Sequence, residues 1–214
     1  MTQSDDRAKR AFDVAIAASL LVLTLPIQAA TALAVRIRLG SPILFKQDRP
    51  GLHAESFEIV KFRTLATIDP ELGLIDDASR MTALGRWLRT TSLDELPTLW
   101  NVVRGDVSLV GPRPLLMSYL ELYSPEQARR HQVRPGLTGL AQISGRNALS
   151  WEEKFRLDVY YVDHHNFVND LKILGRTVRS VMRRDGISAV GEATMPEFRG
   201  TQDLVKPTDR KEHG

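Results

Sequence analysis

The sequence predicts a helix-rich α/β fold of the α+β type: one compact domain with a small β-hairpin and an N-terminal helix–break–helix that re-enters a membrane. Three observations support this prediction. Residues 14–35 carry no charge, two strand-like segments flank the turn Arg49-Pro50-Gly51, and amphipathic stretches dominate the second half. The length of 214 residues suits one domain of moderate size.

The composition excludes several kinds of site. The chain has no cysteine, so disulfides, thiolate metal sites and cysteine nucleophiles are all excluded. The formal charge of +3 and a pI near 9.3 suit anionic partners such as phosphates, nucleotides or acidic lipids. Because the excess of positive charge is small, it selects none of these partners.

The uncharged N-terminal run, Val14 to Val35, has about the length that a membrane helix needs. Pro26 lies in its middle, where a proline removes a helix hydrogen bond and bends the axis. Cationic residues flank both ends, and such flanks are retained on the cytoplasmic side. We therefore expect a re-entrant membrane hairpin bent at Pro26 over residues 1–40. A kinked span and a buried soluble helix are the alternatives.

The breaker residues Gly40-Ser41-Pro42 separate this segment from the main domain, which is expected over residues 41–190. A short strand at Ile43–Phe45 and a second at Ser56–Phe62 are predicted to pair as a hairpin. The acidic and polar stretch 68–79 is predicted to be a surface loop.

The rest of the chain alternates helix-like and breaker-rich stretches. Helices are predicted at Arg80–Arg89, Leu96–Val103, Leu115–Tyr123, Pro125–His131, Trp151–Val162 and Asp170–Arg184. Between them we expect a buried strand at Val107–Val110, a rigid loop at Gly111–Pro114 and an irregular glycine-rich segment over 134–147. Residues 191–214 are predicted to form a polar, partly disordered tail.

Asp94 and Glu95 are the strongest candidates for chemistry. They precede a predicted helix, where free backbone N–H groups and the helix dipole stabilise anions. An aspartate held there stays ionised at neutral pH and could attack phosphorus as a nucleophile. Glu95 could act as a base if burial raised its pKa.

Helix capping accounts for the same two residues without any chemistry. Ser92 and Glu95 have the spacing of a capping box, although that assignment puts Pro97 inside the helix. Taking Asp94 as the cap puts Pro97 in the first turn, which tolerates it. From these residues alone, catalysis and capping both stay open.

Cationic residues are clustered in the motifs around this pair. They are Lys61, Arg63, Arg86, Arg89, Arg113, Arg134 and Arg146. Guanidinium groups bind phosphate oxygens in a bidentate fork, and prolines on both sides of Arg113 would lower the entropy lost on binding. A solvated basic face is the alternative for any single one. A carboxylate pair with Mg²⁺ would suit a diphosphate substrate.

The remaining titratable residues are less informative. His164 and His165 are adjacent rather than metal-spaced. Asp158 and Asp163 recur along the late helices without an assigned role, and Asp170 is a candidate helix cap.

Taken in order, the motifs resemble those of the bacterial sugar transferases, monotopic phosphoglycosyl transferases that act on polyprenyl phosphate. The matching residues are Lys9-Arg10-Ala11-Phe12-Asp13, Pro26, Gly40-Ser41-Pro42, Gln47-Asp48-Arg49-Pro50-Gly51, Lys61-Phe62-Arg63-Thr64, Leu84-Gly85-Arg86-Trp87-Leu88-Arg89, Thr91-Ser92-Leu93-Asp94-Glu95-Leu96-Pro97, Trp100-Asn101-Val102, Gly105-Asp106, Ser108-Leu109-Val110-Gly111-Pro112-Arg113-Pro114, Arg134-Pro135-Gly136-Leu137-Thr138-Gly139, Gln142, Gly145-Arg146-Asn147 and Trp151. Leu65 and Val107 stand where methionine is usual in this family.

The resemblance implies an enzyme whose catalytic domain, residues 41–190, faces the cytoplasm at the bacterial inner membrane. Asp94 would attack a UDP-sugar with loss of UMP, and polyprenyl (undecaprenyl) phosphate would then take the phosphosugar from Asp94. The resemblance also implies that Glu95 assists and that Mg²⁺ lies near Asp94. The residues implied in phosphate or nucleotide contacts are Arg89, Lys61, Arg113, Asp170, Arg63 and Arg146.

The implied partners are a UDP-sugar, polyprenyl phosphate, membrane lipid and downstream glycosyltransferases, with no nucleic acid. The chain resembles the small, catalytic-domain-only members that start glycan assembly with bacillosamine-type or other N-acetylated sugars. The sequence does not specify the sugar, the pathway, the polyprenol length or the oligomeric state. A Mg²⁺-dependent membrane hydrolase that uses water as acceptor is the rival enzyme, and a basic membrane-surface scaffold is the rival from another class.

Overall fold

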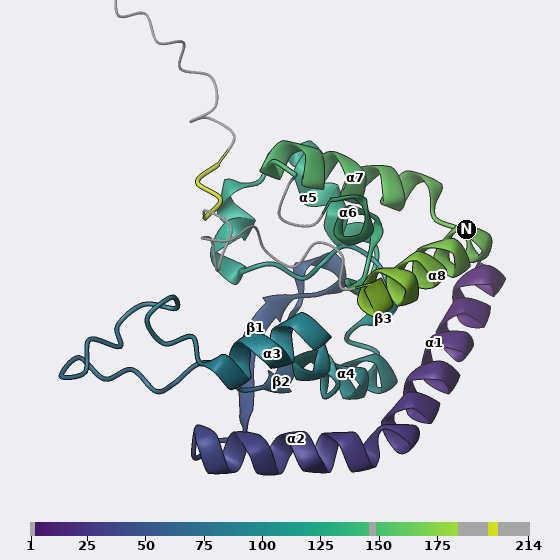
Figure 1. The fold of residues 1–214 in the computed structure, drawn as a ribbon. Coiled ribbons are helices and arrows are strands. Elements are labelled where there is room, and N and C mark those ends of the chain that lie inside the picture. The colour runs from purple at the N-terminus through teal and green to yellow at the C-terminus, as the bar shows by residue number, and fades with distance from the viewer. Residues whose placement is uncertain (1–2, 146–148, 184–196, 201–214) are drawn as a thin grey trace, which may run out of the picture.

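The computed structural model of this protein describes residues 3–145, 149–183 and 197–200. Over these residues the fold is helix-rich, as predicted, and it has two small sheets, of which only the hairpin was expected (Figure 1). The α-helices are α1 (Gln3–Leu23), α2 (Leu25–Arg38), α3 (Ala83–Thr91), α4 (Thr98–Arg104), α5 (Pro125–Ala128), α6 (Leu140–Ser144), α7 (Trp151–His164) and α8 (Phe167–Arg183). The strands are β1 (Leu44–Pro50), β2 (Ser56–Phe62), β3 (Ser108–Val110) and β4 (Gly136–Thr138). Short 3-10 helices lie at Leu52–Ala54, Leu93–Glu95, Met117–Leu122 and Arg129–Gln132.

The two N-terminal helices lie along two edges of the molecule and meet at a sharp corner (Figure 1). The break is at Thr24, and the helices are bent by 62°. Pro26 lies in the first turn of α2, where a helix does not use the missing N–H. The predicted bend near Pro26 is therefore confirmed. No single helix in the described part of the chain is long and apolar enough to cross a membrane, but this bent pair together meets that test of length and composition.

The bent pair has a packed inner side and an apolar outer side. Ala17 of α1 and Val35 of α2 are fully buried, Ala17 against Leu99 and Val102 and Val35 beside Leu88. The outer side exposes large apolar side chains at Ile16, Leu20, Val22, Leu23, Leu25, Ile27, Leu33 and Ile37. Such a surface is larger than scattered apolar residues would give and points to an apolar environment or partner.

The predicted hairpin forms, but the chain reverses later than predicted. Strands β1 and β2 pair antiparallel from Leu44 opposite Phe62 to Pro50 opposite Ser56. Arg49 and Pro50 therefore belong to the strand, and the predicted turn at Arg49-Pro50-Gly51 is wrong. Pro50 is tolerated because it ends an edge strand, where no ladder donor is needed.

The second sheet was missed in part. Strand β3 was predicted, but its parallel partner β4 and helix α6 lie in the stretch predicted to be irregular. The glycines that suggested a loop permit close backbone packing instead, because a Cβ on Gly136 would lie 2.0 Å from the Gly111 nitrogen. This pairing holds the loop that begins at Gly111 against β4.

Two of the later predicted helices differ in detail. Residues 117–122 form a 3-10 helix rather than an α-helix. Helix α8 begins at Phe167, three residues before the prediction, because the Asn166 side chain caps it by accepting from the Asn169 N–H at 2.9 Å. The prediction that Asp170 caps this helix is wrong.

The described part of the predicted tail, residues 197–200, packs on the domain. Phe198 is 4% exposed and contacts an aromatic cluster of Tyr119, Tyr123, Trp151 and Phe155. The other residues of the predicted tail, 191–196 and 201–214, lie outside the described residues.

Candidate active site

The carboxylate pair lies at the junction between α3 and α4. Ser92 ends α3 in the left-handed conformation, with φ 56°, and the following 3-10 turn carries Asp94 and Glu95. Helix α4 begins only at Thr98, with no side-chain hydrogen bond at its cap. Neither Ser92 nor Asp94 caps this helix, so the capping explanation for the pair is wrong.

Glu95 binds two cations through one oxygen. Its Oε1 accepts a hydrogen bond from Lys61 Nζ at 2.6 Å and another from Arg113 Nη2 at 2.9 Å. Burial favours the neutral acid, but these two cations outweigh it and hold the pKa of Glu95 well below its ordinary range. The condition under which Glu95 could act as a base, a pKa raised by burial, is therefore not met. Glu95 is an anion that positions Lys61 and Arg113.

Asp94 has the opposite electrostatic setting. Its side chain is 8% exposed, and within the described residues its buried Oδ1 has no hydrogen-bond partner. Burial and the neighbouring Glu95 charge raise the pKa of Asp94 to about 6, against the pull of Lys61, Arg113 and Arg89. With this pKa the carboxylate is still mostly ionised at neutral pH, but the predicted reason, stabilisation at a helix N-terminus, does not apply because α4 begins only at Thr98.

Arg89 is the third cationic residue near the carboxylate pair, after Lys61 and Arg113. It lies in the last turn of α3, and its Nε donates to Thr64 Oγ1 at 3.1 Å. Helix α3 packs so closely there that a Cβ on Gly85 would lie 1.9 Å from the Thr64 carbonyl oxygen. Three predicted phosphate-binding residues, Lys61, Arg89 and Arg113, therefore surround the Asp94–Glu95 pair. The oxygens of a phosphate group in this ring would be neutralised by the cations, and its phosphorus would lie near a carboxylate nucleophile.

Arg63, another predicted phosphate-binding residue, has different partners. Arg63 donates to the backbone carbonyls of Leu39 and Ser41, so it ties the end of α2 to the hairpin. Arg146 lies outside the described residues, and its predicted role remains a prediction.

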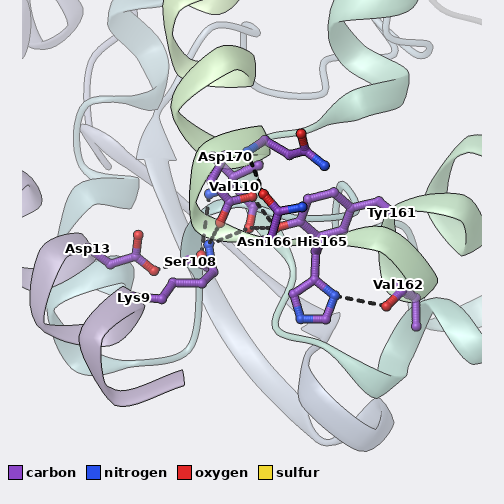
Figure 2. Close-up of polar contacts among 10 residues, drawn as sticks. Lys9, Asp13, Ser108, Val110, Tyr161, Val162, His165, Asn166 and Asp170 are labelled. Atoms are coloured by element: carbon purple, nitrogen blue, oxygen red, sulfur yellow. Dashed lines mark hydrogen bonds and ion pairs between the residues drawn. The ribbon is translucent and has the colours of Figure 1, made fainter. Parts of the chain in front are cut away.

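Asp170, which was also predicted to contact phosphate or nucleotide, is part of a separate buried network (Figure 2). It is 3% exposed, forms an ion pair with Lys9 of α1 and accepts from the Tyr161 hydroxyl at 2.8 Å. Next to it, the Ser108 hydroxyl donates to Asp13 at 2.7 Å. Asp170 therefore joins α1 to α8, with both carboxylate oxygens bonded and almost no exposed surface.

The fit of a Mg²⁺ ion depends on Asp94. Among the described residues no group of three or more His, Cys, Asp or Glu side chains could hold a metal. Mg²⁺ needs fewer, since it is commonly bound by one or two carboxylates with substrate phosphates and water. The unpaired, buried Oδ1 of Asp94 fits such a ligand. His164 and His165, by contrast, direct their Nδ1 atoms to backbone carbonyls of their own helix.

Sequence reasoning missed Arg49 as a candidate. Its Nη2 donates to Gln47 Oε1 at 2.6 Å, and burial together with the nearby charge of Arg113 lowers its pKa. It therefore lies close enough to the cation ring to sense Arg113. Its place in the motif Gln47–Gly51 was the available signal, but Arg49-Pro50-Gly51 was interpreted as a turn.

The comparisons with known proteins agree with this geometry. Residues 4–184 match the family model described as bacterial sugar transferase. The chain is 53% identical to an uncharacterized sugar transferase, EpsL, of Bacillus subtilis, over 92% of this chain and 98% of that protein. It is 42% identical to a UDP-glucose:undecaprenyl-phosphate glucose-1-phosphate transferase of Caulobacter vibrioides, over 84% of this chain and 72% of that protein.

A third relative is longer than this chain. The undecaprenyl-phosphate galactose phosphotransferase of Salmonella typhimurium is 36% identical over 83% of this chain, which spans 41% of that protein. The family match extends over the helix pair, the hairpin and the carboxylate turn alike. The chain belongs to the bacterial sugar transferase family.

Proposed function

We propose that this protein transfers a sugar phosphate from a UDP-sugar to polyprenyl (undecaprenyl) phosphate, releasing UMP and forming a polyprenyl-diphosphate sugar. The observation that carries the proposal is the buried, unpaired Asp94 Oδ1 inside a ring of Lys61, Arg89 and Arg113. The names of the Caulobacter and Salmonella relatives state the same class of donor or acceptor. Such a reaction would be the first membrane step in making an exopolysaccharide, O-antigen, capsule or glycoprotein glycan, ahead of downstream glycosyltransferases.

The proposed reaction has two displacements at one phosphorus. An oxygen of the Asp94 carboxylate attacks the phosphorus that carries the sugar, the bond to the bridging oxygen breaks, and UMP leaves with the bonding electrons. An oxygen of polyprenyl phosphate then attacks the same phosphorus, and the Asp94 carboxylate is released. Each step exchanges one P–O bond for another, so no oxidant or reductant is required.

The cation ring would stabilise charge that develops on the phosphoryl oxygens. Arg113 and Lys61, now held on Glu95, and Arg89, held on Thr64, can each donate to a phosphate oxygen at little cost in reorganisation. Asp94 would also be the residue that holds Mg²⁺, which when bound neutralises a diphosphate and favours departure of UMP. Glu95 keeps its charge and therefore serves to place the cations.

We further propose that the bent pair α1 and α2 enters the cytoplasmic leaflet of the bacterial inner membrane and returns, so that the catalytic unit faces the cytoplasm. The apolar outer side of the pair supports this, as do cationic residues at both of its ends. Trp87 and Trp100 are 51% and 54% exposed on α3 and α4, and tryptophan favours the membrane–water boundary. A soluble nucleotide sugar and a lipid phosphate could then meet at Asp94.

The proposal is tested by offering a panel of UDP-sugars with sugar-phosphate radiolabel to the purified protein in lipid nanodiscs. Without polyprenyl phosphate, the label should stay on the protein and one equivalent of UMP should appear; adding the lipid should move the label to it. Asp94→Ala should give no labelled protein. A protein that releases UMP continuously without lipid would be the rival hydrolase, and full activity of Asp94→Ala would exclude the covalent mechanism.

A further inference from the structure

Arg130 and Asp158 form a buried ion pair that the reaction described above does not use. Arg130 Nη2 and Nε donate to Asp158 Oδ2 at 2.8 and 3.1 Å, and the two side chains are only 2% and 6% exposed. Arg130 lies in the 3-10 turn after α5, and Asp158 lies on α7. Two charges removed from water at this depth need excellent geometry to offset their desolvation.

The same guanidinium reaches the active-site loop. Arg130 Nη2 donates to the backbone carbonyl of Arg113 at 2.7 Å. That carbonyl lies between Pro112 and Pro114, whose rings fix the backbone on either side. An unbroken line of contacts therefore runs from Asp158 through Arg130 to Arg113, and from the Arg113 guanidinium to Glu95 beside Asp94.

Aromatic side chains enclose the ion pair. The Arg130 guanidinium carbon lies 5.6 Å from the ring centre of Phe155 and 5.7 Å from that of Tyr123, whose hydroxyl accepts from Nη1 at 2.9 Å. Phe198 covers Phe155 with ring centres 4.9 Å apart. Rings on two sides leave the guanidinium few alternative positions, so its bond to the Arg113 carbonyl has a fixed direction.

We propose that Arg130 and Asp158 are positioning residues for the transfer reaction: they fix the backbone of Arg113, and through it the guanidinium that binds the phosphate of the donor. This rests on the proposed function, because it takes Arg113 to contact that phosphate. Asp158 orients Arg130, and Arg130 holds the loop. Neither side chain touches the substrate.

A purely structural role makes a different prediction. Apolar residues of similar volume commonly replace a buried ion pair with little loss of stability, and often with a gain. The variant Arg130→Met with Asp158→Leu should therefore fold, with an unfolding midpoint close to that of the native protein. If the pair served stability alone, this double variant would also be fully active.

The experiment measures kcat/KM for UMP release with the UDP-sugar that the panel selects and polyprenyl phosphate, for the full chain in nanodiscs. We expect the Arg130→Met, Asp158→Leu variant to lose about tenfold, since small displacements of a binding group are costly. In an Arg113→Ala background the same two substitutions should cause no further loss, because the residue through which they act is absent. The matched control is Arg129→Met, the neighbouring arginine, which pairs with Glu126 and Asp163 at the surface and should change kcat/KM less than about twofold.

Three outcomes are decisive. Undiminished activity of the folded double variant, or equal losses with and without the Arg113 side chain, would overturn the positioning role while leaving the proposed function intact. Absence of UMP release from the native protein with every UDP-sugar would overturn both. If the double variant does not fold, Arg130→Lys replaces it. The lysine side chain ends near the position of the guanidinium carbon, so it keeps a charge beside Asp158 but lacks the Nη2 atom that reaches the Arg113 carbonyl, and it should show the same dependence on Arg113.

Discussion

Two clusters in this protein each combine buried aspartate with cationic side chains, and the hydrogen bonding of the aspartate differs between them. In the network around Asp170, the carboxylate has partners at both oxygens, Lys9 at one and the Tyr161 hydroxyl at the other. In the active-site cluster, Lys61 and Arg113 donate to Glu95, and Arg89 donates to Thr64. The Asp94 Oδ1 has no partner among the described residues.

The difference separates a structural carboxylate from a reactive one. A buried carboxylate whose oxygens are all bonded holds helices together and has nothing left to offer a ligand. A buried carboxylate with an unsatisfied oxygen raises the free energy of the empty site, and that cost is relieved when the oxygen bonds to phosphorus or to a metal. The predictions below change one cluster at a time.

The largest effect is expected from Asp94→Asn. The amide is a far weaker nucleophile than a carboxylate, so UMP release should fall by about 10³-fold or more. The unfolding midpoint should rise, because the substitution removes a buried charge with an unpaired oxygen. Rate assays and thermal unfolding in nanodiscs check both. A large loss of stability instead would mean that Asp94 has a structural role like that of Asp170.

Asp170→Asn should show the opposite pattern. It leaves the Lys9 ammonium buried without its counter-charge, which costs about 3 kcal/mol of the free energy of unfolding. The KM for the UDP-sugar should stay within about twofold of the native value, because Asp170 is not free to contact substrate. Denaturant unfolding and steady-state kinetics measure the two quantities. Lys46→Met, which breaks the exposed pair with Glu58, is the control and should cost less than about 1 kcal/mol. A selective rise in KM would restore the phosphate contact predicted from the sequence.

Glu95→Gln should reduce kcat/KM by about 10- to 100-fold. The amide oxygen can still accept hydrogen bonds from Lys61 and Arg113, but it no longer neutralises them, so both cations are held less firmly. The same change should lower the pKa of Asp94, because the neighbouring negative charge is one of the causes that raise it. The pH profile of kcat/KM measures this shift. An unchanged profile would show that the two carboxylates do not interact.

The smallest expected effect is that of pH. Lowering the pH should reduce kcat/KM but increase the contribution of Asp94 to the stability of the folded state. Asp94 must be ionised to react, so kcat/KM should fall about tenfold per pH unit below its pKa of about 6. A carboxyl whose pKa is higher folded than unfolded favours the folded state at low pH. This contribution is complete below the unfolded value of 3.8 and disappears as pH rises through about 6. Thermal midpoints of native and Asp94→Asn protein should converge as pH is lowered across this range.

Features set by neighbouring residues could be predicted from the sequence. The bend at Pro26, the hairpin partner Ser56–Phe62 and the helix from Trp151 follow from local breaker and periodicity signals. Asp94, Glu95, Lys61, Arg89 and Arg113 could be selected because their residue types suit phosphate chemistry and because they lie in motifs that resemble those of the sugar transferase family.

Features set by distant packing could not. Strand β4 is three residues long, and Gly136 within it and Gly139 after it signal a loop until Gly111 is known to lie against it. The pKa of Glu95 depends on Lys61, 34 residues away, and no local pattern shows that pairing. Asp158 looked like one of several unassigned acidic residues because its partner, Arg130, is 28 residues earlier.

The shared oxygen of Glu95 has a consequence for how a substrate would enter. Lys61 and Arg113 both bind one anionic oxygen, so Glu95 acts as an internal substitute for phosphate. Entry of a nucleotide sugar is then an exchange of one anion for another and not the filling of a bare cationic pocket. Lys61 and Arg113 need only transfer their hydrogen bonds from Glu95 to the phosphate of the substrate. Inorganic phosphate competes for the same two cations and should therefore be a weak inhibitor.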